Sequence, residues 1–171
     1  MKAIITLFGL PGSGKTTLAD MIHKLTGGAR INADAMRSTI SRDLKFSDDD
    51  RAIQAWRMGR LAAIALAEPP TIVSGENLWT LNSVAVVDFV NPTERTRRTY
   101  DWAIKSDLPF QVKHIRIWMN TITPEQSRFP DTAKLFEAPA TKYATVEVKD
   151  YKTTEELEKI ALAVISYINH N

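Results

Sequence analysis

Residues 3–16 read AIITLFGLPGSGKT, and this stretch decides the fold of the chain. Its final part, residues 9–16, has the spacing G-x-x-x-x-G-K-T of a phosphate-binding P-loop. A β-branched apolar run precedes the motif and predicts a buried strand over residues 3–8. Apolar residues at helical spacing follow the motif up to Leu25, and Gly27-Gly28 then provides a helix stop. Because strand, glycine loop and helix are the context that this motif requires, we expect the chain to bind a nucleoside triphosphate.

The P-loop residues predict ATP and Mg²⁺ as cofactors. Glycines let the backbone curl so that its N–H groups point at phosphate oxygens, and the N-terminus of the following helix adds partial positive charge. We expect Lys15 to reach the β- and γ-phosphates and the Thr16 hydroxyl to hold Mg²⁺. The predicted nucleotide-binding residues are Gly9, Gly12, Ser13, Gly14, Lys15, Thr16 and Thr17.

Composition narrows the class of protein. At 171 residues the chain is expected to form a single domain, 1–171, with a core of its own. The P-loop begins at residue 9, which we interpret as leaving no room for a targeting peptide, and no apolar stretch is long enough to cross a membrane. The sequence has no cysteine, which excludes disulfides and thiol catalysis and fits a cytoplasmic protein. A net charge of +2 suits an anionic substrate but is too weak to argue for nucleic acid as a partner.

Strand-like and helix-like segments alternate along the chain, which favours a parallel sheet with helices on both faces. We therefore predict a three-layer α/β fold built around the P-loop, with a parallel sheet of about five strands. The strands are expected at residues 3–8, 29–32, 84–90, 112–119 and 144–149. The longest helix is expected to be capped by Ser47 and stopped by Pro69-Pro70, and residues 69–83 look like an insertion. Its predicted buried stripe is Ala52, Ala55, Trp56, Gly59, Ala62, Ala63 and Leu66.

Two aspartates are expected where the carboxyl ends of parallel strands form a cleft. Asp34 follows the second strand, and it can accept a proton from an attacking hydroxyl, orient water on Mg²⁺, or cap a helix that starts at Ala35. Asp88 ends an apolar run in a Walker-B-like pattern, as a candidate Mg²⁺ partner or as a turn residue. The predicted catalytic residues are Lys15 and Asp34, and the predicted metal-binding residues are Thr16, Asp34 and Asp88.

Two phenylalanines stand beside basic residues. Phe46 lies between Arg42 and Arg51, and Phe129 follows Arg128 directly. An aromatic ring next to a cation can stack a planar base. The alternatives are that Phe46 belongs to the core and that Phe129 anchors an ordinary surface loop.

Together these segments resemble adenylylsulfate (APS) kinase. Residues 42–51, RDLKFSDDDR, stand where that family has R-D-L-G-F-S-x-x-D-R, and Asp34 with Arg37 matches its D-x-x-R. Further on, residues 89–92 resemble F-I-S-P and residues 134–139 resemble D-P-Y-E-x-P. The resemblance covers most of the chain and is most specific between residues 34 and 60. Its compact form looks like the short APS-kinase-like proteins of phage genomes.

The resemblance implies roles for residues of this chain in holding the acceptor of the phosphoryl group. It implies that Phe46 and Phe129 enclose the acceptor's base. It also implies that its anionic groups are bound by Arg37, Arg51, Gln54 and Arg97, and we add Arg128 to this acceptor site.

The chain also departs from the family pattern. Between Thr121 and Phe129 only a few residues stand where the family has a basic lid, and Asp88 has no acidic counterpart. Four further residues differ in type from the family motifs. The family has an acid in place of Asn32, an asparagine in place of Ser41, an asparagine in place of Gln54 and a serine in place of Asn91. Because of these departures, the resemblance supports kinase chemistry better than it supports APS as the acceptor.

We therefore predict a kinase that transfers the γ-phosphoryl group of ATP to a hydroxyl of a nucleotide-like acceptor. The first candidate is the 3′-hydroxyl of APS, and the alternative is another hydroxyl, such as that of a hydroxymethyl-pyrimidine or a nucleic-acid end. A third interpretation is a nucleotide-dependent switch that hydrolyses ATP slowly. The predicted partner is a small-molecule nucleotide, no membrane contact is expected, and a homodimer is left open.

Overall fold

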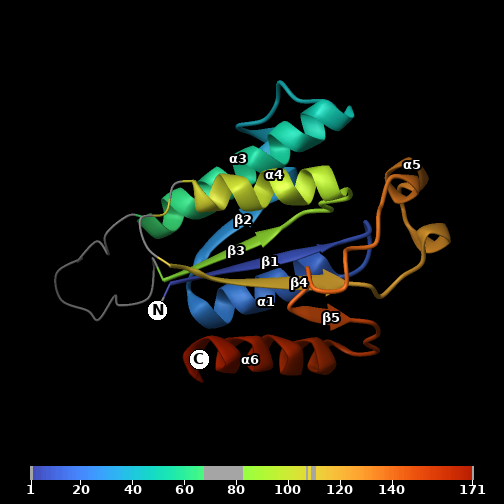
Figure 1. Cartoon of the computed structure of the whole chain (residues 1–171). Coiled ribbons are helices and arrows are strands. Elements are labelled where there is room, and N and C mark those ends of the chain that lie inside the picture. Colours follow the sequence, from blue (N-terminus) through green and yellow to red (C-terminus); the bar gives the residue numbers. More distant parts are fainter. Residues whose placement is uncertain (1, 68–82, 107, 109–110, 171) are drawn as a thin grey trace.

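The computed structural model describes residues 2–67, 83–106, 108 and 111–170. Within them, five parallel strands form one sheet in the order β2-β3-β1-β4-β5 (Figure 1). The strands are β1 Ala3–Gly9, β2 Ala29–Asn32, β3 Val84–Asp88, β4 Lys113–Met119 and β5 Val146–Val148. This confirms the predicted parallel sheet.

Helices cover both faces of the sheet (Figure 1). On one face lie α1 Lys15–Thr26 and α6 Thr154–His170, and on the other α3 Asp48–Ala67 and α4 Glu94–Lys105. The short elements are α2 Ala33–Ser38, the 3₁₀ turn η1 Pro124–Gln126 and α5 Pro130–Lys134. In the described part of the chain, no helix has the length and apolar character needed to span a membrane.

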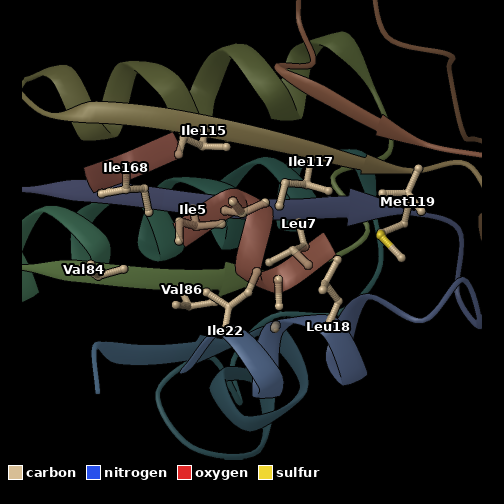
Figure 2. Close-up of a cluster of buried hydrophobic side chains, with 14 of the residues drawn as sticks. Ile5, Leu7, Leu18, Ile22, Val84, Val86, Ile115, Ile117, Met119 and Ile168 are labelled. Atoms are coloured by element: carbon tan, nitrogen blue, oxygen red, sulfur yellow. The ribbon is translucent and has the colours of Figure 1, made fainter. Parts of the chain in front are cut away.

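The core has two halves, one on each face of the sheet. Strand β1 is buried along its whole length, because both of its faces are covered by helices. Its Ile5 and Leu7 pack in one cluster with Ile168 of α6 (Figure 2). The neighbouring Ile4 points to the opposite face and packs in a second cluster with Tyr100 of α4. The sheet is thereby held rigidly, with its loops at the carboxyl ends of the strands.

The long helix α3 confirms most of its predicted pattern. The Ser47 hydroxyl accepts a hydrogen bond from the backbone N–H of Asp50 at 3.2 Å, as expected of a helix cap. The predicted stripe is buried except for Trp56, which is 37% exposed and stacks against Arg60. Met58 takes the inner position instead, since it lies between Ala55 and Ala62 on the face toward β3 and α4. The stop at Pro69-Pro70 and the insertion-like segment up to residue 82 lie outside the described residues.

Candidate active site

The P-loop connects the end of β1 to the start of α1. Gly14 is the N-cap of α1 with a φ of +88°, and Gly12 has a φ of +97°, so both positions need glycine. Of the predicted nucleotide-binding residues, Gly12, Lys15 and Thr16 line a large cavity. The others, Gly9, Ser13, Gly14 and Thr17, form the rest of the loop and the first turn of α1.

Lys15 lies buried within the curl of the loop. Its ammonium donates to the carbonyl oxygen of Leu10 at 2.7 Å and to the Ser13 hydroxyl at 3.4 Å. Burial lowers the pKa of Lys15 to about 8, although the charges of Asp88 and Asp34 act in the opposite direction. The lysine is therefore held at the phosphate cradle with a charge that is easily lost.

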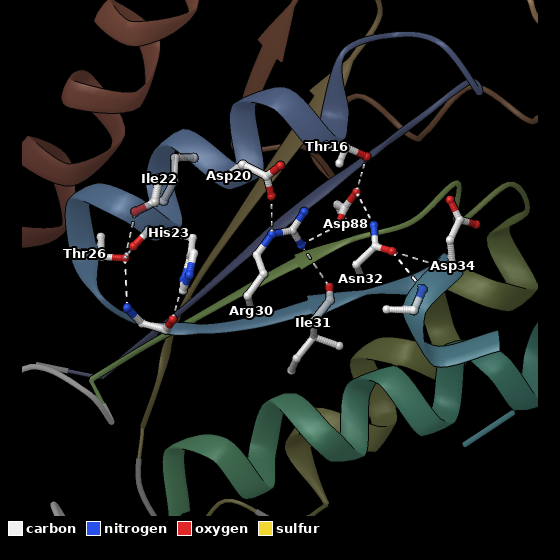
Figure 3. A network of polar contacts seen from close by, with 12 residues as sticks. Thr16, Asp20, Ile22, His23, Thr26, Arg30, Ile31, Asn32, Asp34 and Asp88 are labelled. Carbon is white, nitrogen blue, oxygen red and sulfur yellow. Dashed lines mark hydrogen bonds and ion pairs between the residues drawn. The ribbon is translucent and has the colours of Figure 1, made fainter. Parts of the chain in front are cut away.

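Asp88 stands at the centre of a polar network at the carboxyl end of β3 (Figure 3). The Thr16 hydroxyl donates to Asp88 Oδ2 at 2.8 Å, and the Asn32 amide donates to both carboxylate oxygens at 3.1 and 3.2 Å. Arg30 of β2 forms an ion pair with Asp88 and a second one, of 2.9 Å, with Asp20. Because the Thr16 hydroxyl donates its hydrogen to Asp88, the lone pairs of the Thr16 oxygen remain available to coordinate a cation.

These residues fit a Mg²⁺ ion held together with phosphate oxygens. Thr16, Asp34 and Asp88 offer the oxygen ligands that Mg²⁺ prefers, and all three line the same cavity. The described residues contain no group of three or more His, Cys, Asp or Glu side chains able to hold a metal by themselves. A Mg²⁺ site here would thus depend on the nucleotide for several of its ligands.

Asp34 lies in the first turn of α2 and faces the cavity. The interpretation of Asp34 as a helix cap is wrong, because the side chain of Asn32 is the cap and accepts from the backbone N–H groups of Asp34 and Ala35 at 3.0 and 2.9 Å. The Asp34 carboxylate is thereby left without a capping role. Its charge acts on Lys15, so the two predicted catalytic residues are electrostatically coupled.

The cavity extends from the P-loop to the segment around Phe46 and has a volume of about 760 Å³. Six of the seven predicted acceptor-binding residues line it: Arg37, Phe46, Arg51, Gln54, Arg128 and Phe129. Phe46 is 65% exposed and Phe129 62% exposed, so neither ring belongs to the core. The guanidinium carbons of Arg37 and Arg51 lie 4.5 and 5.6 Å from the centre of the Phe46 ring.

Arg97 is the one predicted acceptor-binding residue that does not line this cavity, so its role in binding the acceptor stays a prediction that the cavity does not support. Arg97 is buried in α4 and donates to the backbone carbonyl oxygens of Asn91, Pro92 and Glu137 at 3.2, 3.3 and 3.1 Å. These three hydrogen bonds fix the position of the guanidinium against the backbone. Arg97 thereby links Asn91 and Pro92, which line the cavity, to Glu137.

Sequence reasoning missed several residues that shape the site. Arg30 and Asn32 were not predicted to bind Asp88, although both lie on β2 beside the strand that carries it. Asn91 lines the cavity, and its only sequence signal was that it departs from the APS kinase pattern. Tyr151 gave no signal, yet its hydroxyl touches the position that a Cβ atom on Gly14 would occupy.

The sheet order, the P-loop and the Thr16–Asp88 pair define the class as a P-loop kinase fold. The chain belongs to the family described as AAA domain, whose profile matches residues 4–122. The predicted resemblance to APS kinases is also confirmed by relatives. An adenylyl-sulfate kinase of Paraburkholderia xenovorans is 23% identical over an alignment of 180 residues, gaps included, that covers 96% of this chain and 93% of that protein. One from Bacillus pumilus is 33% identical over an alignment of 102 residues, gaps included, that covers 57% of this chain and 45% of that protein.

Solved structures share the fold with this chain. The APS kinase CysC of Mycobacterium tuberculosis, in complex with AMPPNP and APS, matches with a TM-score of 0.73 and 15% identity, over 96% of this chain and 98% of that one. A gluconokinase from Sinorhizobium meliloti matches with a TM-score of 0.63 and 17% identity, over 97% and 93%. At such identities the likeness shows the fold alone, so the acceptor has to be argued from the site.

Proposed function

We propose that this protein is an ATP-dependent kinase that phosphorylates a hydroxyl group of a nucleotide-like acceptor. The observation that carries the proposal is one cavity lined both by the phosphate loop and by an exposed aromatic ring, Phe46, that two arginines contact. A site with both features suits the transfer of a phosphoryl group from one bound molecule to another.

In the proposed reaction the acceptor's hydroxyl oxygen attacks the γ-phosphorus of ATP. The bond from that phosphorus to the bridging oxygen breaks, ADP leaves with the electron pair, and the hydroxyl proton passes to the Asp34 carboxylate. Lys15 and the loop N–H groups hold the β- and γ-phosphate oxygens. Thr16, oriented by Asp88, and the carboxylates of Asp34 and Asp88 would hold Mg²⁺, which when bound neutralises charge on the phosphates.

Adenylylsulfate is the first acceptor to test. The curated relatives named above are adenylyl-sulfate kinases, and the arginines beside Phe46 suit an anionic nucleotide. Another nucleotide or nucleic-acid hydroxyl is the second candidate. It is favoured by the polar side chains of Gln54 and Asn91, which line the cavity and differ from the APS kinase pattern.

A slow ATPase switch is the weaker interpretation, because a switch needs no second binding region of this kind. Labelled ATP should be offered to the protein with APS, hydroxymethyl-pyrimidine nucleotides or DNA, and free phosphate should be measured in parallel. A kinase transfers label to an acceptor and releases little phosphate without one. Lys15→Ala is the control, with an expected loss of about 10³-fold or more in rate. Phosphate release that no acceptor alters would contradict the proposal in favour of the switch.

A further inference from the structure

Two side chains in the cavity carry buried polar atoms that have no hydrogen-bond partner among the described residues. They are Asn91, 1% exposed, with both its amide oxygen and its amide nitrogen, and Gln54, 3% exposed, with its amide oxygen. Both residues line the cavity that also contains Lys15 and Thr16. Buried polar atoms without partners destabilise a folded protein, so their presence in a cavity points to a ligand that supplies the missing partners.

The backbone holds Asn91 in a fixed position. It has a φ of +47°, and among the described residues it is the only non-glycine residue with a positive φ. Asparagine tolerates this conformation better than most residues. Arg97 donates to its carbonyl oxygen, and Val90 before it accepts a 3.2 Å hydrogen bond from the N–H of Gly9 in the P-loop. The amide is therefore attached to a rigid turn next to the phosphate cradle.

The free atoms define the kind of group that they can bind. The amide nitrogen of Gln54 already donates to the carbonyl oxygen of Ala33 at 3.4 Å, so its oxygen remains as an acceptor. Asn91 adds one further acceptor oxygen and an NH₂ donor. A sulfate or ionised phosphate only accepts hydrogen bonds, and it would set its oxygens against two amide oxygens. Cationic partners for an anion are offered instead by Arg37 and Arg51, which line the same cavity.

We propose that Asn91 and Gln54 are specificity-determining residues that bind an uncharged group of the acceptor. The group presents an N–H or O–H donor beside a hydrogen-bond acceptor, as the edge of a nucleobase or the hydroxyls of a sugar do. The inference rests on the proposed function, since it needs the acceptor in this cavity. Both positions depart from the APS kinase pattern, so this recognition is a property of the present chain.

Two variants of Gln54 separate an uncharged group from an anion. Both variants lose the amide donor to Ala33, but Gln54→Glu keeps an acceptor oxygen and adds negative charge, whereas Gln54→Leu also removes the acceptor at similar volume. If the group donates a hydrogen bond, Gln54→Leu weakens acceptor binding by about tenfold or more, and Gln54→Glu weakens it less. If an anion binds there, the order of the two variants reverses, and the proposal is overturned.

Asn91 is tested with replacements that accept its backbone conformation. Asn91→Asp and Asn91→Gly both tolerate positive φ, and both lose the NH₂ donor, so each should weaken acceptor binding by about tenfold or more. Ser41→Ala is the matched control, because the Ser41 hydroxyl is also buried without a partner among the described residues but does not line the cavity. We expect Ser41→Ala to leave acceptor binding unchanged.

The probes are adenosine, guanosine, cytidine, uridine, free ribose and APS, titrated by calorimetry into protein saturated with a non-hydrolysable ATP analogue. If the protein discriminates among the nucleosides, the group bound is the edge of a base. If nucleosides and ribose bind equally, the group is a sugar hydroxyl. Either result supports the proposal, provided that the Asn91 variants bind the probe more weakly. Binding of APS alone, binding of no probe, or variants that bind like the wild type would overturn it. Failure of the proposed function would give a different result: nucleosides would still bind, but no phosphoryl group would be transferred.

Discussion

At the scale of single residues, Lys15 combines burial with a charge that phosphate binding needs. Because burial lowers its pKa from 10.5 to about 8, the folded protein binds fewer protons than the unfolded chain between these two pH values. The cost of burying the charged lysine is therefore fully present below pH 8, and stability should rise as the pH increases from 8 toward 10.5. Burial of the charged Lys15 therefore lowers the stability of the nucleotide-free protein, and it places a positive charge in the phosphate loop.

The same shift predicts proton uptake on ATP binding. Near pH 8 about half of the Lys15 side chains are neutral, and bound phosphates should restore their charge, so each ATP should bring up to about half a proton into the complex. Calorimetry in buffers of different ionisation enthalpy measures this uptake. At pH 6 it should vanish, because Lys15 is already charged. The control is Lys15→Arg, whose guanidinium keeps its proton at pH 8; uptake unchanged in that variant would exclude Lys15 as its source.

Asp34 and Asp88 make a second prediction at this scale. Asp34→Asn should lower turnover more than ATP affinity, since asparagine keeps the side-chain shape but loses the charge and the ability to accept a proton. Asp88→Asn is the comparison, because Asp88 orients Thr16 and should act mainly through Mg²⁺ dependence. Steady-state kinetics at varied ATP and Mg²⁺ distinguish the two. Near-normal turnover in Asp34→Asn, with none in Asp88→Asn, would mean that the essential carboxylate is Asp88 on β3.

Single residues also show where sequence reasoning about the site ends. Lys15 and Thr16 follow a motif with strict spacing, Asp88 follows a shorter Walker-B-like pattern, and the structure brings all three to one cavity. The role of Arg97 was taken from a resemblance, which cannot reveal that this side chain is buried and donates to three backbone carbonyl oxygens. The network that joins Arg30 to Asp88 depends on which strands are neighbours, and that pairing is not written in either segment.

At the scale of elements, helices α3 and α4 meet at Gly59. A Cβ atom at Gly59 would lie 2.7 Å from the carbonyl oxygen of Tyr100 and 2.9 Å from the Cβ of Ala103, closer than packed atoms can stand. Gly59→Ala should therefore destabilise the protein by about 1–3 kcal/mol despite the better helix propensity of alanine. Thermal or denaturant unfolding measures this change. Ile53→Ala, at an exposed site on the same helix, should shift stability by no more than about 0.5 kcal/mol. Equal effects of the two would refute close packing at Gly59.

Element types were predictable because the hydrophobic pattern has the right period in each segment. In β4, Ile115, Ile117 and Met119 alternate with less buried residues, as the sequence predicted. The inner face of α3 was less certain, because Trp56 and Met58 are both apolar and only packing against α4 decides between them. An indole at the flank of a helix can keep one face in water, and period alone does not distinguish this position from the core.

At the scale of the whole molecule, the alternation of strands and helices was enough to predict a parallel sheet with covered faces, and the P-loop fixed which end of it carries the site. The shape of the cavity was harder to predict, because its walls come from four distant parts of the chain. They are the P-loop, residues 32–54, residues 88–96 and residues 128–132. Contacts among such loops depend on side chains that have no periodic pattern.

Phe46 and Phe129 come from opposite parts of the chain, and the fold brings both to the same cavity with their rings exposed. We expect them to enclose one planar base when the acceptor binds, each contributing about 1–3 kcal/mol. Phe46→Ala and Phe129→Ala should then raise the acceptor KM by about ten- to a hundredfold and leave ATP affinity nearly unchanged. Leu162→Ala, at an exposed site on α6 outside the cavity lining, is the control and should change neither constant. An acceptor KM that stays normal in both phenylalanine variants would show that the acceptor's base does not lie between these rings.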